Sequence, residues 1–187
     1  MCDVIELEKA TAIPRENSYI LSYPHILRYF GSRETFTESD VIVGSHIVFG
    51  WISTILELRP APTHSIAEAA RVLDDLRRGT KPSEGEVLAL ARLVNNSVVA
   101  ASKLLHFVAP DDFAIWDTNV CRYMFDRGRP DRRPSELRLY REYLDRLAAI
   151  KQEPEFAAFH ASVNRKLGYE VSPLRAIELI MYLNAKA

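Results

Sequence analysis

Cysteine and glycine are scarce in this sequence, with two and seven residues respectively among 187. Cys2 and Cys121 are too few for a disulfide framework and lack the short spacing that metal ligands show. The chain also has no glycine-rich phosphate-binding loop, no Gly-x-Ser-x-Gly motif and no His-Glu-x-x-His motif. These absences predict a protein with no disulfide framework, no bound metal and no cofactor.

A long uninterrupted apolar run is also missing. The longest apolar stretch, residues 41–56, contains Gly44, Ser45 and His46, and it falls short of the roughly 20 residues that a membrane span requires. The first nine residues carry acids where a signal peptide has a basic start. We therefore expect a soluble, cytoplasmic protein without a membrane partner, in which residues 41–56 form a buried core helix.

Net charge is close to zero, at −1, so the whole chain has no electrostatic attraction to nucleic acid or membrane. The charges are nevertheless unevenly spread. Residues 1–60 carry eight acidic residues against five basic ones, whereas residues 122–151 carry nine basic residues against five acidic ones. The second segment is thus a local basic region, with a charge of +4, in a neutral protein.

Two interpretations of this basic region stay open. Arginines around its turn, such as Arg132 and Arg133, can follow a nucleic acid backbone. The acids interleaved with them favour a solvated helix face held by ion pairs at four-residue spacing, as between Arg141 and Asp145.

Helix signals dominate the chain. Three segments place a hydroxyl residue at a helix start with an acid three residues later, which is the capping-box pattern or close to it. Apolar residues at helical spacing follow each one, and no strand-like alternation is present. The three pairs are Thr37 with Asp40, Ser65 with Glu68, and Ser83 with Glu86.

These signals predict an all-α fold, a compact bundle of about eight or nine helices in a single domain over residues 1–187. Two lobes around a cleft, residues 1–60 and 61–187, are a further possibility, with the boundary at the proline-containing segment 60–64. Short β-prone runs such as Val4-Ile5 and the segment 114–116 can be extended, but they cannot build a sheet.

The most informative segment precedes and includes Asp117. Helices over residues 84–94 and 98–107, joined by Asn95-Asn96-Ser97, predict an αα-hairpin. Asparagine tolerates the left-handed backbone that so tight a turn needs. Ser97 is a plausible N-cap, and the free N–H groups behind it can bind an anion. A turn and an extended apolar stretch then lead to Asp117, an acid at the start of a new helix.

This order of a hairpin, an apolar helix, a proline-containing turn, a short hydrophobic segment and the string Asp117-Thr-Asn-Val-Cys-Arg122 resembles the helix–hairpin–helix DNA glycosylases. The resemblance covers about residues 84–127. It implies an all-α protein that cleaves the base–sugar bond of a nucleotide flipped out of double-stranded DNA. Val98 stands where bifunctional members have a nucleophilic lysine, which implies a monofunctional enzyme that uses water.

The same resemblance implies roles for individual residues. Asp117 matches the catalytic acid, which would stabilise an oxocarbenium-like transition state while water attacks C1′. We expect a base pocket lined by Trp51, Trp116 and Tyr123, because aromatic faces stack on bases. The expected nucleic-acid contacts are Asn95, Asn96, Ser97, Lys103, Arg122, Arg132 and Arg133.

Structural interpretations of these residues are also open. Asp117 can cap its helix by accepting from the N–H groups of residues 119–120. Lys103 can form an ion pair with a nearby aspartate, and His106 and His46 can be hydrogen-bonded core residues. The string Lys103-Leu-Leu-His-Phe107 also resembles a group of small bacterial proteins of unassigned function. Two other functions therefore stay possible: a catalytically silent nucleic-acid-binding module, and a protein-interaction component that touches no nucleic acid.

Overall fold

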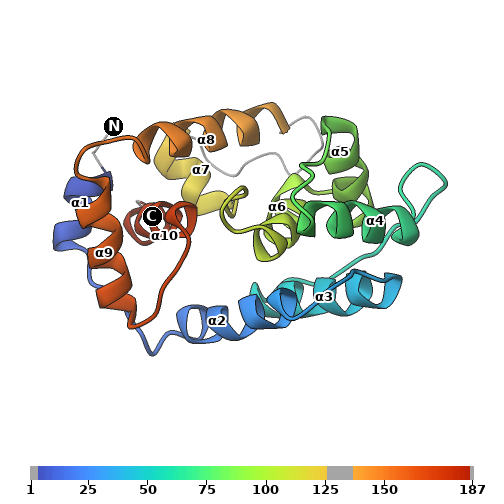
Figure 1. Cartoon of the computed structure of the whole chain (residues 1–187), viewed down its shortest axis with the longest axis horizontal. Helices are drawn as coiled ribbons and strands as arrows, with labels where there is room; N and C mark the ends of the chain where they lie inside the picture. Colours follow the sequence, from blue (N-terminus) through green and yellow to red (C-terminus); the bar gives the residue numbers. More distant parts are fainter. Residues whose placement is uncertain (1–3, 126–136, 186–187) are drawn as a thin grey trace.

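The computed structural model describes residues 4–125 and 137–185, and these residues form ten α-helices and no strand (Figure 1). The predicted all-α fold is therefore confirmed. In chain order the helices are α1 (Val4–Ala10), α2 (Ser18–Gly31), α3 (Glu38–Trp51), α4 (Ile66–Arg77), α5 (Glu84–Leu93), α6 (Val98–Val108), α7 (Thr118–Phe125), α8 (Leu137–Ile150), α9 (Phe156–Leu167) and α10 (Pro173–Asn184).

Local capping signals correctly predict the starts of four helices, α3 to α6. Thr37 and Ser83 each form a complete capping box, with Asp40 and Glu86 respectively. Ser65 caps α4 and Ser97 caps α6 in the same way, through a side-chain oxygen that accepts a backbone N–H. Each of these contacts joins residues only three positions apart, so the sequence alone is sufficient to predict where the helix begins.

Three local predictions need correction. Val4 and Ile5 are helical and buried in α1, because packing against α9 and α10 overrides their β-branched preference. The helix predicted over residues 41–56 ends earlier, at Trp51, and Ser53 follows in a left-handed conformation with a φ of 51°. His46 lies on the exposed side of α3 rather than in the core.

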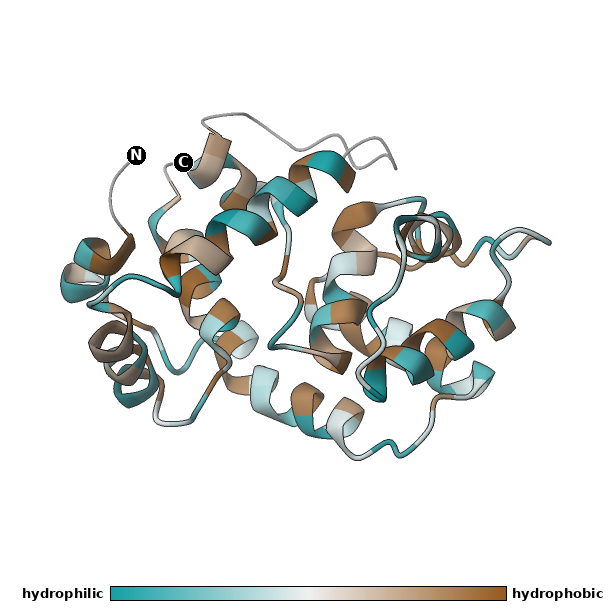
Figure 2. Cartoon of the chain, turned by 45° about the horizontal axis from the view of Figure 1, so that its top comes forward, coloured by the Kyte–Doolittle hydropathy of each residue, from teal (hydrophilic) through white to brown (hydrophobic). Residues whose placement is uncertain are grey.

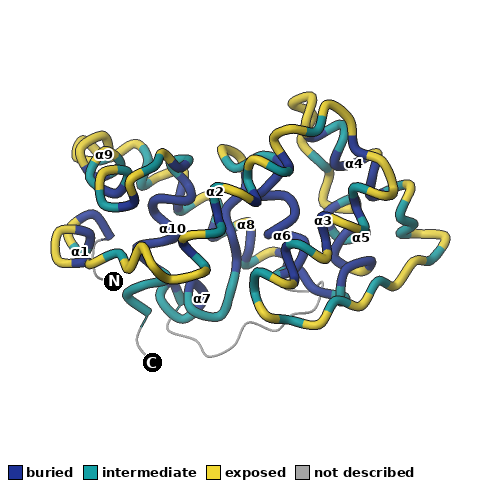
Figure 3. The backbone as a smooth tube through the Cα atoms, turned by 90° about the horizontal axis from the view of Figure 1, so that it is seen from below, coloured by how far each residue is buried: buried dark blue, intermediate teal, exposed yellow. Residues whose placement is uncertain are grey.

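Two helices, α6 and α10, form the centre of the molecule. Ten of the eleven residues of α6 are buried, and it packs against α2, α3, α4 and α5. In α10 eight residues are buried, and it packs against α1, α7, α8 and α9. Figure 3 shows both as dark, buried segments, and Figure 2 shows the apolar residues of the surrounding helices. Their buried residues are mostly apolar, but α6 also buries Lys103 and His106, and α10 buries Arg175 and Glu178.

Helices from the two ends of the chain meet in this arrangement. Figure 1 shows α1 beside α9 and α10 at one end of the molecule, with α3, α4 and α5 at the other end and α2 along one edge. Helices before residue 60 thus pack against helices after it at both ends of the molecule. The division into two lobes at residues 60–64 stays a prediction. None of the helices described has both the length and the apolar composition that crossing a bilayer requires.

The turn between α5 and α6 has the conformation that its asparagines allow. Asn95 and Asn96 have φ values of 54° and 47°, in the left-handed region. The Asn95 side chain also joins this turn to the loop after α3. Its Nδ2 donates to the carbonyl of Ile55, and its Oδ1 accepts from the backbone N–H of Glu57, each at 2.8 Å. The turn and the loop therefore hold each other in place.

Candidate functional site

An extended, buried segment, residues 113–116, connects α6 to Asp117. Its backbone lies in neither a helix nor a sheet, so side chains must satisfy its polar groups. Three of these side chains come from α6. His106 Nδ1 lies 2.7 Å from the carbonyl oxygen of Phe113, and Lys103 Nζ donates to the carbonyl of Trp116 at 3.0 Å. Ser102 Oγ accepts from the Trp116 N–H at 3.1 Å.

Two tyrosines of α8 bind the remaining carbonyls of the segment. Tyr140 donates its hydroxyl to the carbonyl of Ala114 at 2.9 Å, and Tyr143 donates to that of Ile115 at 3.2 Å. All four carbonyls from residue 113 to residue 116 thus accept a side-chain hydrogen bond. An unsatisfied buried carbonyl costs roughly 1–3 kcal/mol. This set of bonds therefore fixes the backbone that places Asp117.

His106 is a neutral, hydrogen-bonded core histidine, as one of the sequence interpretations predicts. A carbonyl oxygen can only accept, so Nδ1 carries the proton that is donated to Phe113. Nε2 then accepts from the Tyr23 hydroxyl, 2.9 Å away. Complete burial, with a smaller contribution from the Arg175 charge, lowers the pKa of His106 to about 3.

Asp117 combines a capping bond with a position on an open surface. Its Oδ1 accepts from the backbone N–H of Val120 at 2.9 Å at the start of α7, so the predicted N-cap role is confirmed. The residue is only half-buried, unlike the fully buried Ile115 and Trp116 before it. The N-terminal end of a helix stabilises negative charge. Asp117 therefore presents a carboxylate that the backbone holds in place.

A pocket of about 400 Å³ lies against Asp117. Pockets that bind small molecules measure roughly 300–1,000 Å³. The lining comes from the start of α2, the end of α3 with its following loop, α6, the start of α7, and α10. Its residues are Ser18, Tyr19, Trp51, Ile52, Ser53, Thr54, Val99, Lys103, Asp117, Thr118, Asn119 and Tyr182.

Stacked aromatic rings form one wall of this pocket. The rings of Tyr19 and Trp51 are nearly parallel, at 11°, with centroids 4.1 Å apart. Tyr182 stacks on Tyr19 with centroids 5.1 Å apart and an angle of 17°. Trp51 Nε1 also donates to the backbone carbonyl of Tyr19 at 3.0 Å, which locks the end of α3 against the start of α2. The three rings thus form an aromatic stack, with Tyr19 stacked on both of the others, beside a carboxylate.

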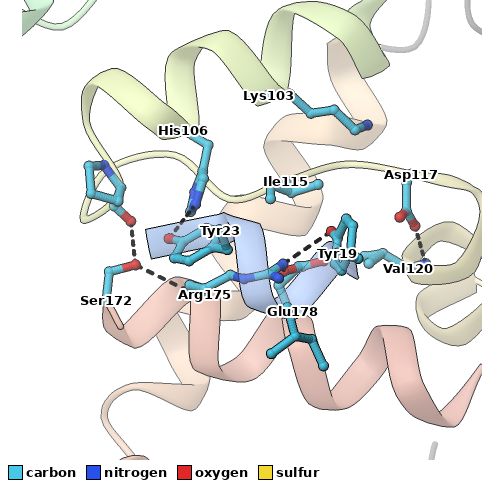
Figure 4. A network of polar contacts seen from close by, with 12 residues as sticks. Tyr19, Tyr23, Lys103, His106, Ile115, Asp117, Val120, Ser172, Arg175 and Glu178 are labelled. Carbon is cyan, nitrogen blue, oxygen red and sulfur yellow. Dashed lines mark hydrogen bonds and ion pairs between the residues drawn. The ribbon is translucent and has the colours of Figure 1, made fainter. Parts of the chain in front are cut away.

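Behind this wall lies a fully buried ion pair. Arg175 and Glu178, one turn apart on α10, contact each other, and Arg175 Nη1 lies 3.3 Å from the Tyr19 hydroxyl. Figure 4 shows the pair beside Tyr19 and Tyr23, with Asp117 on the far side of Tyr19 and Lys103 above it on α6. The pair thus lies one layer below the pocket surface.

The structure brings together three residues predicted for the site. Trp51, Lys103 and Asp117 come from α3, α6 and the start of α7, and all three line the pocket. The side chain of Lys103 is nevertheless buried, at 3% exposure, and its Nζ donates to the carbonyls of Val99 and Trp116. Its hydrogen bonds to the backbone were not predicted.

The other predicted residues lie elsewhere. Trp116 is a core residue instead of a base-pocket residue: it is fully buried against Tyr140 and Tyr143 and does not line the pocket. Tyr123 is half-buried on α7 and also lies outside the lining, as does the half-buried Arg122 on the same helix.

The predicted hairpin-turn contacts have structural roles in this fold. Ser97 is buried and uses its hydroxyl to cap α6, so it does not present that group to a phosphate. Asn95 uses its amide to hold the loop after α3, and Asn96 is half-buried beside it.

Arg132 and Arg133 lie outside the described residues. On α8, Arg141 pairs with Glu84 of α5 rather than with Asp145.

Sequence reasoning missed Tyr19 and Tyr182, which form two thirds of the aromatic wall. Neither stands near Asp117 in the chain, and neither belongs to a motif, so no local signal identifies them.

Within the described residues no group of three histidine, cysteine, aspartate or glutamate side chains is placed to hold a metal ion. No protein-family model, no curated protein and no solved structure matches this chain.

Proposed function

We propose that the pocket binds the base and sugar of a nucleotide and that Asp117 promotes cleavage of the bond between them. One observation carries the proposal: a carboxylate and a stack of aromatic rings line the same pocket of about 400 Å³. Stacking on aromatic side chains contributes roughly 1–3 kcal/mol per base and suits any base with a planar face. In the proposal, a bound base extends the stack of Trp51, Tyr19 and Tyr182 by one more ring.

The proposed reaction is hydrolysis of an N-glycosidic bond. The C1′–N bond breaks and its electron pair leaves with the base, which takes up a proton from solvent. Positive charge develops on the sugar, and the Asp117 carboxylate stabilises it electrostatically. Water then attacks C1′ and loses a proton, so the products are a free base and a sugar hydroxyl.

Lys103 supports a water-dependent reaction rather than a covalent one. Its Nζ donates hydrogen bonds to the backbone carbonyls of Val99 and Trp116, and its side chain is buried. An amine held by these two bonds is not placed to attack the sugar as a nucleophile. We therefore assign Lys103 the task of holding the backbone before Asp117 and of adding positive charge to the α6 side of the pocket.

The charges of the pocket favour a neutral ring over a free nucleoside polyphosphate. Lys103 and Asp117 are the two charged residues of opposite sign among the lining residues described. Lys103 is the cation of this lining, and its Nζ already donates to two backbone carbonyls, so it cannot neutralise the charge of three phosphates. In the proposal, contacts to a nucleic acid backbone would come from residues outside the pocket, and double-stranded DNA is the proposed partner.

The proposal can be tested without knowing which base is released. A duplex oligonucleotide that carries a pyrrolidine ring in place of one deoxyribose mimics the cationic transition state. Enzymes bind such analogues more tightly than substrates. We expect the protein to bind this duplex more tightly than the same duplex with an ordinary nucleotide. In Asp117→Asn the ratio of the two affinities should fall by at least about tenfold.

Asp112→Asn is the matched control, because Asp112 carries the same charge on the exposed turn before the segment and pairs with Lys81. It should retain the wild-type preference. Release of modified bases from oligonucleotides, followed through cleavage of the abasic product, then assigns the substrate. An absence of preference in the wild-type protein would contradict the proposal.

A catalytically silent binding module is the second candidate. The bond from Asp117 to the Val120 N–H favours it, because capping α7 is a sufficient reason for an aspartate at this position. This candidate predicts salt-dependent duplex binding that is equal for the two duplexes and unchanged in Asp117→Asn. The same titrations therefore separate the two functions.

A further inference from the structure

The ion pair between Arg175 and Glu178 needs a physical explanation. Both side chains are essentially inaccessible, at 1% and 0% exposure. Removing two charges from water costs several kcal/mol per ion, and apolar replacements are often as stable or more stable. In addition, Glu178 Oε1 has no hydrogen-bond partner among the described residues. The pair is therefore poorly explained as a device for stability.

Its surroundings point to the pocket wall. The guanidinium carbon of Arg175 lies 5.1 Å from the ring centroid of Tyr19, 4.6 Å from that of Tyr23 and 6.0 Å from that of Trp51. Nη1 of Arg175 also contacts the Tyr19 hydroxyl at 3.3 Å. Arginine attracts aromatic faces through their quadrupoles, more strongly when water is absent. Arg175 thus contacts two of the three wall rings from the buried side.

We propose that Arg175, oriented by Glu178, is a positioning residue of the pocket, which holds Tyr19 and Trp51 stacked so that a bound ring meets a wall of fixed geometry. Neither charged group lines the pocket, so neither touches the ligand. They act through Tyr19. A fixed platform binds more tightly because less side-chain entropy is lost when the ligand arrives. The link to a nucleotide rests on the proposed function, whereas the stacking of the wall does not.

The charges around Glu178 make this support sensitive to pH. Burial raises the pKa of Glu178 to about 7, while the Arg175 guanidinium opposes the shift. Asp117, before α7, raises this pKa further, and Lys103 of α6 lowers it. The phenols that face the pair come from Tyr19 and Tyr23 of α2, Tyr143 of α8 and Tyr182 of α10, and burial raises the pKa of each.

The charge of Glu178 controls how strongly the Arg175 guanidinium acts on the neighbouring aromatic rings. When Glu178 is ionised, it draws the guanidinium charge toward itself. When Glu178 is neutral, that charge acts on the faces of Tyr19, Tyr23 and Trp51 without compensation. The environment of Trp51 should therefore differ between the two protonation states, with a midpoint near the pKa of about 7.

The first experiment measures the wall without any ligand. Near-ultraviolet circular dichroism and acrylamide quenching of fluorescence both report on tryptophan. The chain has two tryptophans, so the variant Trp51→Phe shows which part of each signal comes from Trp51 and which from Trp116. We expect a single transition between about pH 6 and pH 8 in the wild-type protein, and none in Glu178→Gln. Glu68→Gln removes a carboxylate from an exposed ion pair with Arg71 and should keep the transition. The same transition in Glu178→Gln would overturn the inference.

The second experiment separates positioning from stability. Arg175→Met alone leaves a buried carboxylate without its partner and is expected to unfold easily. The double variant Arg175→Met with Glu178→Leu replaces the whole pair by apolar groups, so it should keep the melting temperature within a few degrees. We expect it nevertheless to show at least about threefold stronger quenching of Trp51. Unchanged quenching in a folded double variant would refute the positioning role.

The pyrrolidine-containing duplex then connects the wall to binding. If the wild-type protein binds it, the double variant should bind about tenfold or more weakly. If the wild-type protein does not bind it, the proposed function fails, while the quenching result still decides the positioning role. The two failures are therefore distinguishable.

Discussion

The Nζ atom of Lys103 lies 3.0 Å from the carbonyl oxygen of Trp116, the residue immediately before Asp117. This contact joins the buried helix α6 to the backbone that carries the candidate catalytic carboxylate. The same Nζ also donates to the carbonyl of Val99, 3.2 Å away and one turn earlier on α6. Lys103 therefore ties two segments of the chain together at the edge of the pocket.

Replacement of Lys103 by methionine should destabilise the protein. Methionine keeps the length and apolar stem but leaves the buried carbonyl of Trp116 without its donor, which costs roughly 1–3 kcal/mol. The free energy of unfolding in urea measures the loss. The control is Lys81→Met, which removes an exposed lysine that pairs with Asp112 on the surface. Surface pairs contribute about 0–1 kcal/mol, so equal losses in the two variants would argue against the assigned role.

His106 and Glu178 should influence stability in opposite directions as pH changes. The pKa of His106 is lowered from 6.5 to about 3, so between these values only the unfolded chain binds the proton and stability falls as pH falls. The pKa of Glu178 is raised from 4.5 to about 7, so between these values only the folded chain binds the proton and stability falls as pH rises. The two effects oppose each other between pH 4.5 and 6.5.

Glu178→Gln should unmask the histidine contribution. Without the opposing carboxyl, the free energy of unfolding should rise with pH between 4.5 and 6.5 more steeply than in the wild-type protein. The limit is about 1.4 kcal/mol per pH unit for one proton. Urea unfolding at half-unit steps of pH gives both curves. Curves that run parallel across this window would show that Glu178 does not bind a proton on folding there.

The turn between α5 and α6 provides a matched pair of variants. Asn95 and Asn96 both have a positive φ, so glycine relieves backbone strain at either position. Only Asn95 loses side-chain bonds to the carbonyl of Ile55 and the N–H of Glu57. Asn96→Gly should therefore be neutral or slightly stabilising, whereas Asn95→Gly should lose about 1–2 kcal/mol.

Asn95→Gly should also loosen the loop that contributes Ser53 and Thr54 to the pocket. Hydrogen exchange of the loop amides measures this directly, and it should be faster in Asn95→Gly than in Asn96→Gly. Identical exchange in the two variants would mean that the Asn95 side chain does not hold the loop.

Features that depend on neighbours in sequence were predictable, and features that depend on the fold were not. The Thr37 and Ser83 caps and the left-handed asparagine turn involve residues within a few positions of one another, so the sequence identifies them. The cap role of Asp117 is of the same kind. Its place in a pocket with Trp51 was expected only through the family resemblance, whose relation to this chain stays a prediction.

Trp51 and Trp116 show why the site itself was only partly predictable. Both tryptophans adjoin isoleucine in the chain, and nothing local distinguishes a ring in a pocket wall from a ring in the core. The difference arises because Trp51 ends α3 and meets Tyr19, while Trp116 faces the α8 tyrosines. Tyr140 and Tyr143 likewise match an ordinary apolar helix stripe until α8 is placed over the segment 113–116. Tertiary placement decides these roles.

The bonds around residues 113–116 have a consequence for how this protein tolerates sequence change. Four of these bonds end on a backbone carbonyl, which every amino acid possesses, and begin at a hydroxyl, imidazole or amino group, which few possess. The fifth runs from the Trp116 N–H to the Ser102 hydroxyl, and every residue except proline has such an N–H. Substitutions within the segment that keep apolar volume should preserve the position of Asp117, whereas changes at Ser102, Lys103, His106, Tyr140 or Tyr143 should not. In remote relatives that share this site, the five donors and acceptors should be recognisable when the segment they hold is not.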